Sequence, residues 1–124
     1  MQPCISWFEI PTADFARAIR FYETVLAITL HSEDMGPMRM ALFPKGAEDA
    51  VGGALCHMEG GNPPGPMGTV VYLYAGDDLA APLARVVPAG GQVIVPKTLI
   101  KPEIGYFAVF RDSEGNHVGL YSMH

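Results

Sequence analysis

The pattern of apolar and polar positions predicts one order of elements that occurs twice along the chain. Residues 3–10 are a short aromatic and β-branched run that a proline ends, which is typical of a strand. Residues 12–14 offer N-cap side chains, and apolar residues then recur at helical spacing up to about residue 27. Three further apolar runs follow, at 28–32, 38–43 and 51–58. The first half therefore reads as β-α-β-β-β.

A segment rich in proline and glycine separates the two halves. Residues 59–68 (E-G-G-N-P-P-G-P-M-G) cannot hold a helix or a central strand, because prolines remove N–H donors and glycines favour open conformations. We expect these residues to be the linker of a single domain over residues 1–124. The linker then joins module 1 (1–58) to module 2 (69–124).

The second half repeats the order of the first. Its predicted elements are a strand at 69–75, an Ala-rich helix from 77 to about 87, a strand at 92–95, and a hairpin with strands at 107–110 and 117–121. Residues 112–116 (D-S-E-G-N) form the hairpin turn, since Asp, Gly and Asn supply turn chemistry. Residues 97–105 are expected to form a flap over a cleft, or only a connection.

The last strand contains a glycine that needs an explanation. Alternation places Val118 and Leu120 on one face, and His117, Gly119 and Tyr121 on the other. Glycine in a strand interior weakens the strand, because it adds backbone entropy and packs no side chain. We therefore expect Gly119 to leave room in a binding cleft.

Three motifs carry a resemblance to a known family. They are W-F-E-I-P-x-A-D-x-x-R-A-x-x-F-Y from Trp7 to Tyr22, G-G-A-L at 52–55, and D-x-E-G-N-x-x-G-L at 112–120. With them the chain resembles the vicinal oxygen chelate superfamily, which contains glyoxalase I, extradiol dioxygenases, fosfomycin-resistance enzymes and bleomycin-binding proteins. The resemblance implies an α+β fold of two β-α-β-β-β modules whose sheets curve into a U-shaped cleft, and a homodimer.

The resemblance also implies where a metal would be held. In metal-dependent members one ligand lies on the first strand of each module, seven residues before the Asp that opens the helix, and another is the Glu of an I-E-L motif on the last strand. The matching positions here are Trp7, Val71, Ala54 and Gly119. None of these side chains can donate to a divalent ion. We expect no catalytic metal at this place, and no other cofactor.

Alternation extends the predicted cleft to neighbouring positions. The residues expected to face it are Ile5, Trp7, Glu9, Gly52, Ala54, Cys56, Met58, Thr69, Val71, Leu73, His117, Gly119 and Tyr121. The residues expected to pack against the helices are Phe8, Ile10, Val51, Leu55, Val70, Tyr72, Tyr74, Val118 and Leu120. The first set mixes small, aromatic and polar groups, as ligand pockets do.

Two residues of the cleft set are candidates for catalysis. Glu9 is a general acid or base if desolvation raises its pKa, or else a solvated carboxylate at the cleft mouth. His117 transfers a proton together with Tyr121, or else is a solvated residue at a strand end.

The expected substrate-binding residues are Trp7, Ala54, Cys56, Val71, Gly119 and Tyr121. Trp7, the only tryptophan, is either a stacking wall for a planar ligand or a plug that fills the space left at Ala54 and Gly119. Cys56 is expected to be an inert thiol, because no basic partner is evident.

Charge and composition exclude some partners. Thirteen acidic against eight basic residues give a net charge of -5 without a basic stripe, which argues against binding to nucleic acid or anionic membranes. No 18-residue apolar run and no basic, apolar leader occur, so we expect a cytoplasmic protein.

Three functions remain open at this point. The first is a metal-free protein that binds a small, partly apolar or aromatic molecule, with turnover undecided. The second is a metal-dependent lyase or dioxygenase of the glyoxalase type, with ligands at unexpected positions such as Glu9, His57 or His117. The third is a dimeric scaffold whose cleft is filled by side chains.

Overall fold

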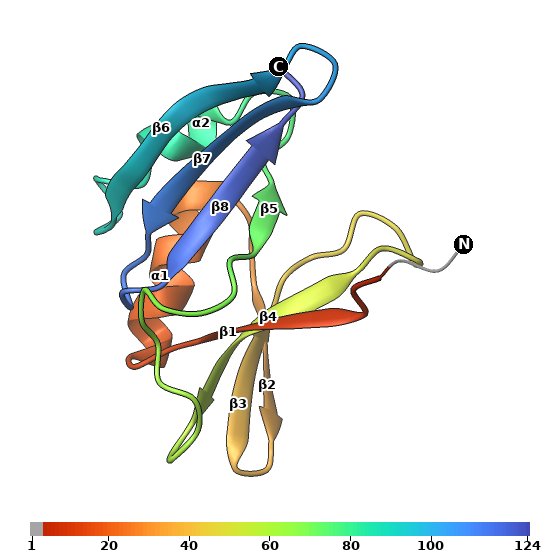
Figure 1. The fold of residues 1–124 in the computed structure, drawn as a ribbon. Coiled ribbons are helices and arrows are strands. Elements are labelled where there is room, and N and C mark those ends of the chain that lie inside the picture. The colour runs from red at the N-terminus through yellow and green to blue at the C-terminus, as the bar shows by residue number, and fades with distance from the viewer. Residues whose placement is uncertain (1–3) are drawn as a thin grey trace.

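A computed structural model describes residues 4–124, which form two four-stranded sheets and two helices (Figure 1). The first half contains β1 (Trp7–Pro11), α1 (Phe15–Leu26), β2 (His31–Met35), β3 (Met38–Leu42) and β4 (Gly52–Met58). The second half contains β5 (Tyr72–Tyr74), α2 (Ala80–Ala84), β6 (Gln92–Lys101), β7 (Gly105–Arg111) and β8 (His117–Ser122). The repeated β-α-β-β-β order and the α+β class are confirmed.

The two sheets have the same topology. The first sheet has the strand order β1-β4-β3-β2, and the second sheet has the order β5-β8-β7-β6. In each sheet the first strand of the half pairs in parallel with the last, and the remaining pairs are antiparallel. This equivalence is what a duplicated unit predicts.

Capping residues define both ends of helix α1. Asp14 is the N-cap, and its side chain accepts a hydrogen bond from the Arg17 N–H at 3.0 Å. Ala27 ends the helix in the left-handed conformation, with φ of 55°, and its N–H donates to the Glu23 carbonyl. The apolar stripe that predicted the helix is its buried face, made of Phe15, Ala18, Phe21, Tyr22 and Val25.

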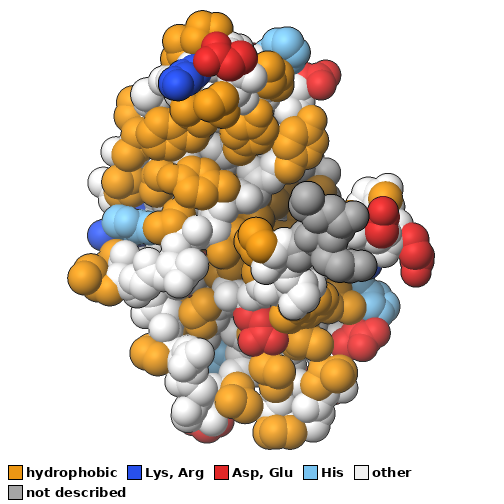
Figure 2. Space-filling model, turned by 45° about the vertical axis from the view of Figure 1, so that its right-hand side comes forward, with side chains coloured by type: hydrophobic (Ala, Val, Ile, Leu, Met, Phe, Trp, Pro, Cys, Tyr) orange, Lys and Arg blue, Asp and Glu red, His pale blue; other side chains and the backbone are white. Residues whose placement is uncertain are grey.

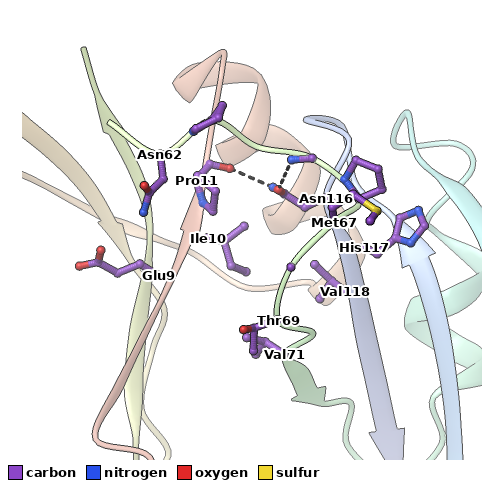
Figure 3. Close-up of a pocket in the computed structure, with 14 residues that line it drawn as sticks. Glu9, Ile10, Pro11, Asn62, Met67, Thr69, Val71, Asn116, His117 and Val118 are labelled. Atoms are coloured by element: carbon purple, nitrogen blue, oxygen red, sulfur yellow. Dashed lines mark hydrogen bonds between the residues drawn. The ribbon is translucent and has the colours of Figure 1, made fainter. Parts of the chain in front are cut away.

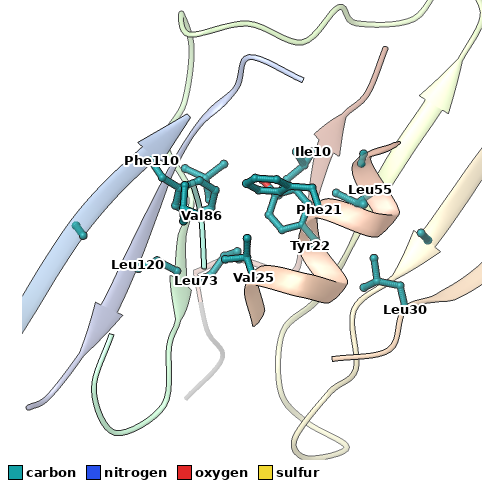
Figure 4. Packing of buried hydrophobic residues seen from close by; sticks show 14 of the residues in the cluster. Ile10, Phe21, Tyr22, Val25, Leu30, Leu55, Leu73, Val86, Phe110 and Leu120 are labelled. Carbon is teal, nitrogen blue, oxygen red and sulfur yellow. The ribbon is translucent and has the colours of Figure 1, made fainter. Parts of the chain in front are cut away.

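The buried face of α1 joins the two halves in one core. Figure 4 shows Phe21, Tyr22 and Val25 between side chains of the second sheet, such as Phe110, and side chains of the first sheet, such as Leu55. All five side chains are almost completely buried. Each contributes roughly 1.5–3 kcal/mol of hydrophobic stabilisation. The faces of the two sheets that do not pack on α1 are therefore left for other contacts.

The turn between β7 and β8 reaches across to the start of α1. The Glu114 carboxylate accepts hydrogen bonds from the N–H groups of Ala13 at 2.8 Å and Asp14 at 2.7 Å. The Arg17 side chain donates to the same carboxylate at 2.8 Å. A carboxylate at a helix N-terminus satisfies free N–H groups and is favoured by the helix dipole. Glu114 thus fixes module 2 on module 1.

Two neighbours in this turn extend the contact. The Tyr22 hydroxyl donates to Asp112 at 2.8 Å inside the core. The Asn116 amide donates to the Pro11 carbonyl at 2.9 Å and accepts from the Gly65 N–H at 3.0 Å. The turn therefore also holds the end of β1 and the linker.

The predicted orientation of the strand at 69–75 was wrong. Leu73 is 8% exposed and lies in the core, whereas Tyr72 and Tyr74 are 51% and 72% exposed. Every position from 70 to 75 is apolar or aromatic, so alternation could not choose the face. The exposed positions suit tyrosine, whose hydroxyl then stays in water. Val51 and Val70, also predicted to pack inward, are exposed and lie just before β4 and β5.

The expected flap was also wrong. Residues 97–101 continue β6, which pairs with β7 as far as Lys101 opposite Gly105. The predicted strand ended at residue 95, but β6 continues through Pro96, because β6 is the edge strand of its sheet and its register shifts between Val95 and Thr98. An edge strand tolerates a residue without an N–H at such an irregularity. Four other elements differ from the prediction: β5 and α2 are shorter, β2 lies at His31–Met35 and not at 28–32, and β1 begins at Trp7. Residue 3 of the predicted first strand lies outside the described residues.

None of the helices in the described part of the chain is long and apolar enough to cross a membrane.

Replacing Glu114 with glutamine tests the contact between the halves. Burial alone would raise the pKa of Glu114, but its hydrogen bonds, the strongest from Arg17, outweigh this and lower the pKa from 4.5. A depressed pKa means that ionised Glu114 stabilises the fold above about pH 4.5, and that this is lost as pH falls through the folded-state pKa. We expect Glu114→Gln to lower the free energy of unfolding by about 2 kcal/mol at neutral pH. Urea unfolding measures it.

The acid-induced loss of stability should also be smaller in Glu114→Gln than in the unsubstituted chain. The exposed Glu103 provides a matched control, and Glu103→Gln should leave both the stability and its pH dependence unchanged. Equal pH dependence in Glu114→Gln and the parent chain would contradict the assigned contact.

Candidate functional site

The space beside Gly119 is filled by an aromatic ring. Tyr72 pairs with Gly119 across β5 and β8, so the two residues share a face of the second sheet. A Cβ atom added at Gly119 would lie 2.2 Å from a carbon of the Tyr72 ring. The glycine is therefore required for Tyr72 to lie flat on the strand. From the sequence we expected a ligand or the Trp7 side chain to fill this space.

Tyr72 forms part of an apolar pocket on the second sheet. The pocket has a volume of about 410 Å³ and is lined by Tyr72, Ile100, Ile104, Phe107 and Tyr121, which we call the aromatic face. The rings of Tyr72 and Phe107 meet edge to face, with centroids 6.3 Å apart. The Tyr121 hydroxyl donates to the Ile104 carbonyl, which ties the turn after β6 to β8. Figure 2 shows hydrophobic side chains gathered over the upper part of the molecule, where Figure 1 places the second sheet.

The first sheet carries a second group of predicted residues. Trp7 is 42% exposed, and its indole N–H donates to the Glu9 carboxylate at 3.1 Å. Ala54 and Cys56 are buried beside them on the same face. Burial, and then the neighbouring Glu9 carboxylate, raises the pKa of Cys56 to about 12. The thiol is therefore protonated at neutral pH and, as it stands, a poor nucleophile.

The two candidate catalytic residues line one cavity but do not act on a common point. A cavity of about 270 Å³ lies at the seam between the sheets, under the linker, and both Glu9 and His117 line it. Figure 3 shows their side chains at opposite sides, not pointing toward one another. Glu9 is exposed, so the desolvation that a general base would need is absent. The buried His117 Nε2 has no hydrogen-bond partner within residues 4–124.

The predicted site residues thus form two groups rather than one. Trp7, Ala54, Cys56 and Glu9 lie on the first sheet, whereas His117, Gly119 and Tyr121 lie on the second. Val71 precedes β5 and packs partly against the core, and it lines the seam cavity together with Glu9 and His117.

Sequence reasoning missed four residues of the aromatic face. Tyr72 was assigned to the wrong side of its strand, and Ile100 and Ile104 were placed in a flap. Phe107 was placed in a strand, but its face was not assigned. The available signal was the pair of isoleucines flanking the turn K-P-E, which mark a hairpin and not a mobile loop.

The residues at the expected metal positions do not fit a divalent ion. Trp7, Ala54, Val71 and Gly119 offer no donor atom, and the Tyr72 ring covers Gly119. Within residues 4–124 no group of three or more His, Cys, Asp and Glu side chains could hold a metal ion. His57 points to the helix side of its sheet, where its ring lies near Phe15.

Comparison with known proteins assigns the family. The model of the Glyoxalase/Bleomycin resistance protein/Dioxygenase superfamily matches residues 4–120. The chain belongs to this superfamily. The resemblance carried by the sequence motifs is thereby confirmed. "Putative glyoxylase CFP32" of Mycobacterium bovis and of Mycobacterium tuberculosis is 36% identical over 109 residues, which are 88% of this chain. The chain spans only 40% of the length of these relatives.

Solved structures of the superfamily share the fold. Glyoxalase I from Zea mays matches with a TM-score of 0.70 at 20% identity, over 95% of this chain and 45% of that chain. TnmS3, an antibiotic binding protein from Streptomyces sp. CB03234, matches with a TM-score of 0.66 at 28% identity, over 97% of this chain and 95% of that chain. A glyoxalase/bleomycin resistance protein from Albidiferax ferrireducens T118 has a TM-score of 0.62 at 18% identity, over 97% of this chain and 98% of that chain.

Substitution of Gly119 tests the role given to it. Because a Cβ atom would collide with the Tyr72 ring, we expect Gly119→Ala to destabilise the fold by about 1–3 kcal/mol. In a Tyr72→Ala background the same substitution should cost much less, since the ring is gone. Chemical unfolding of the four proteins of this double-mutant cycle measures the coupling. Equal costs in both backgrounds would show that Gly119 serves another purpose.

Proposed function

We propose that the chain binds a small, planar, largely apolar molecule on the aromatic face, without a catalytic metal. The observation that carries this proposal is the open apolar pocket of about 410 Å³ on the second sheet. Its size lies within the range of small-molecule sites. A face filled by its own side chains would instead have favoured a scaffold.

The chemistry of the pocket favours an aromatic ligand. Tyr72 and Phe107 present ring faces and edges at its wall, and such surfaces attract a further ring by about 0.5–1.5 kcal/mol beyond area burial. The Tyr72 and Tyr121 hydroxyl groups supply a small number of polar contacts. The solved relative with 28% identity is an antibiotic binding protein, which also supports binding.

A second copy of the chain is proposed to complete the site. All residues that line the pocket come from the second half, so one wall is missing. Trp7 and Met58, on the free face of the first sheet, are 42% and 44% exposed and offer an apolar counterpart. Exposed apolar surfaces of this kind commonly mark interaction sites. In the proposed homodimer, the first sheet of one copy covers the aromatic face of the other.

A matched pair of isoleucines tests the binding site. Ile100 lines the pocket, whereas Ile94 lies on the same strand, is similarly exposed and is outside the pocket. With 8-anilinonaphthalene-1-sulfonate as an apolar aromatic probe, we expect Ile100→Ala to weaken binding about tenfold, because it removes roughly 1.4 kcal/mol of apolar contact. Ile94→Ala should leave it unchanged. Equal affinities in a fluorescence titration of both variants would reject the aromatic face as the site.

The oligomeric state tests the second wall. Sedimentation of the full chain across a range of protein concentrations should show a dimer, and Trp7→Ala should shift the equilibrium toward monomer. Ile94→Ala again serves as the control that removes exposed apolar surface elsewhere. A chain that binds the probe while remaining monomeric would contradict the homodimer but not the aromatic face.

A further inference from the structure

Sulfur-containing side chains gather on one face of the first sheet. Met38 lies opposite Met58, and Met40 lies opposite Cys56, on the neighbouring strands β3 and β4. Residues two apart on a strand share a face, and so do directly opposed residues. These four side chains therefore form a block of two by two, which we call the sulfur cluster. On β2, Met35 pairs with Met38 and adds a fifth sulfur at its edge.

The strand register places the four side chains next to one another on one face. Cβ atoms of directly opposed residues are about 4.5–5.5 Å apart. Methionine has three rotatable bonds and a polarizable thioether, so its sulfur reaches across such a distance without backbone movement. Cys56 is buried, whereas the Met58 side chain is 44% exposed. The cluster therefore runs from a partly exposed thioether to a buried thiol.

The charges around the sulfur cluster suit a cation. Glu33 lies opposite Met40 on β2 and shares its face. Glu9 approaches from the other side, on β1 opposite Ala54. The basic side chain between the two methionines of β3, Arg39, lies on the opposite face, 4.7 Å from the centre of the Phe15 ring. His57 points to that same face.

We propose that Met38, Met40, Met58 and Cys56 bind one cuprous ion. Thioether and thiolate sulfur are soft ligands, and soft ligands select Cu(I) over the hard divalent ions. On binding, the copper–sulfur bond to Cys56 forms as the thiol proton leaves to solvent, and the oxidation state of the metal does not change. The sulfur cluster shares no residue with the aromatic face, but Met58 also belongs to the surface that covers a partner's aromatic face in the proposed homodimer.

Competition with a coloured Cu(I) chelator, bicinchoninate, tests the site under anaerobic reducing conditions. The exposed Cys4 is first replaced by serine, because it is a second free thiol. We expect this full-length chain to withdraw one equivalent of Cu(I) from the chelator. The double variant Met38→Leu/Met58→Leu keeps the apolar volume and removes two thioethers, and should bind at least tenfold more weakly. Cys56→Ser should weaken binding as well.

Met67 provides the matched control. It is 90% exposed in the linker and away from the sulfur cluster, so Met67→Leu should bind Cu(I) like the parent chain. Circular dichroism of each apo-protein establishes that it is folded, and X-ray absorption of the loaded parent chain should show sulfur as the dominant neighbour of copper. The proposal is overturned if the parent chain withdraws no copper, if Met38→Leu/Met58→Leu binds unchanged, or if copper has only nitrogen and oxygen neighbours.

Discussion

The Glu114 carboxylate is the contact that places the two halves on one another. It lies in a turn of module 2, yet it accepts hydrogen bonds from the N–H groups of Ala13 and Asp14, at the start of α1, and binds Arg17 in module 1. Without it, the free N–H groups at the start of α1 would be buried against the turn and unsatisfied. Asp112 and Asn116 fix the same turn from its two sides. The orientation of α1, and with it the position of both sheets, follows from this group of contacts.

The same turn determines what the second sheet can bind. Strand β8 leaves the turn at His117, so the position of the turn sets the register of Gly119 beside Tyr72. Because α1 covers the inner faces of both sheets, the aromatic face and the sulfur cluster are left on outer faces. The proposed function thus depends on surfaces that the core leaves free. Under that proposal a partner copy, and not the chain alone, encloses the ligand.

Local patterns in the sequence predicted most of the fold. The cap at Asp14, the helical stripe of α1 and the turn at 112–116 are short-range signals, and each was found where expected. The face of β5 could not be predicted, because its neighbourhood is apolar at every position. The candidate site was predicted only in part. Trp7 and Tyr121 were expected to line one cleft, but α1 packs between the sheets that carry them, and local sequence patterns do not reveal this packing. The hydrogen bond between Glu114 and the start of α1 joins residues one hundred positions apart, so no local sequence pattern predicts it.

The distance along the chain between α1 and its cap has a consequence for synthesis on the ribosome. Helix α1 is made early, whereas Glu114 follows the Asp14 N–H by one hundred residues. A twelve-residue helix is only marginally stable by itself in water. The apolar stripe of α1 in the nascent chain therefore stays exposed until the hairpin of β7 and β8 has been translated. Folding of this chain should be a late, concerted event, and chaperones that hold exposed apolar segments have their longest opportunity at α1.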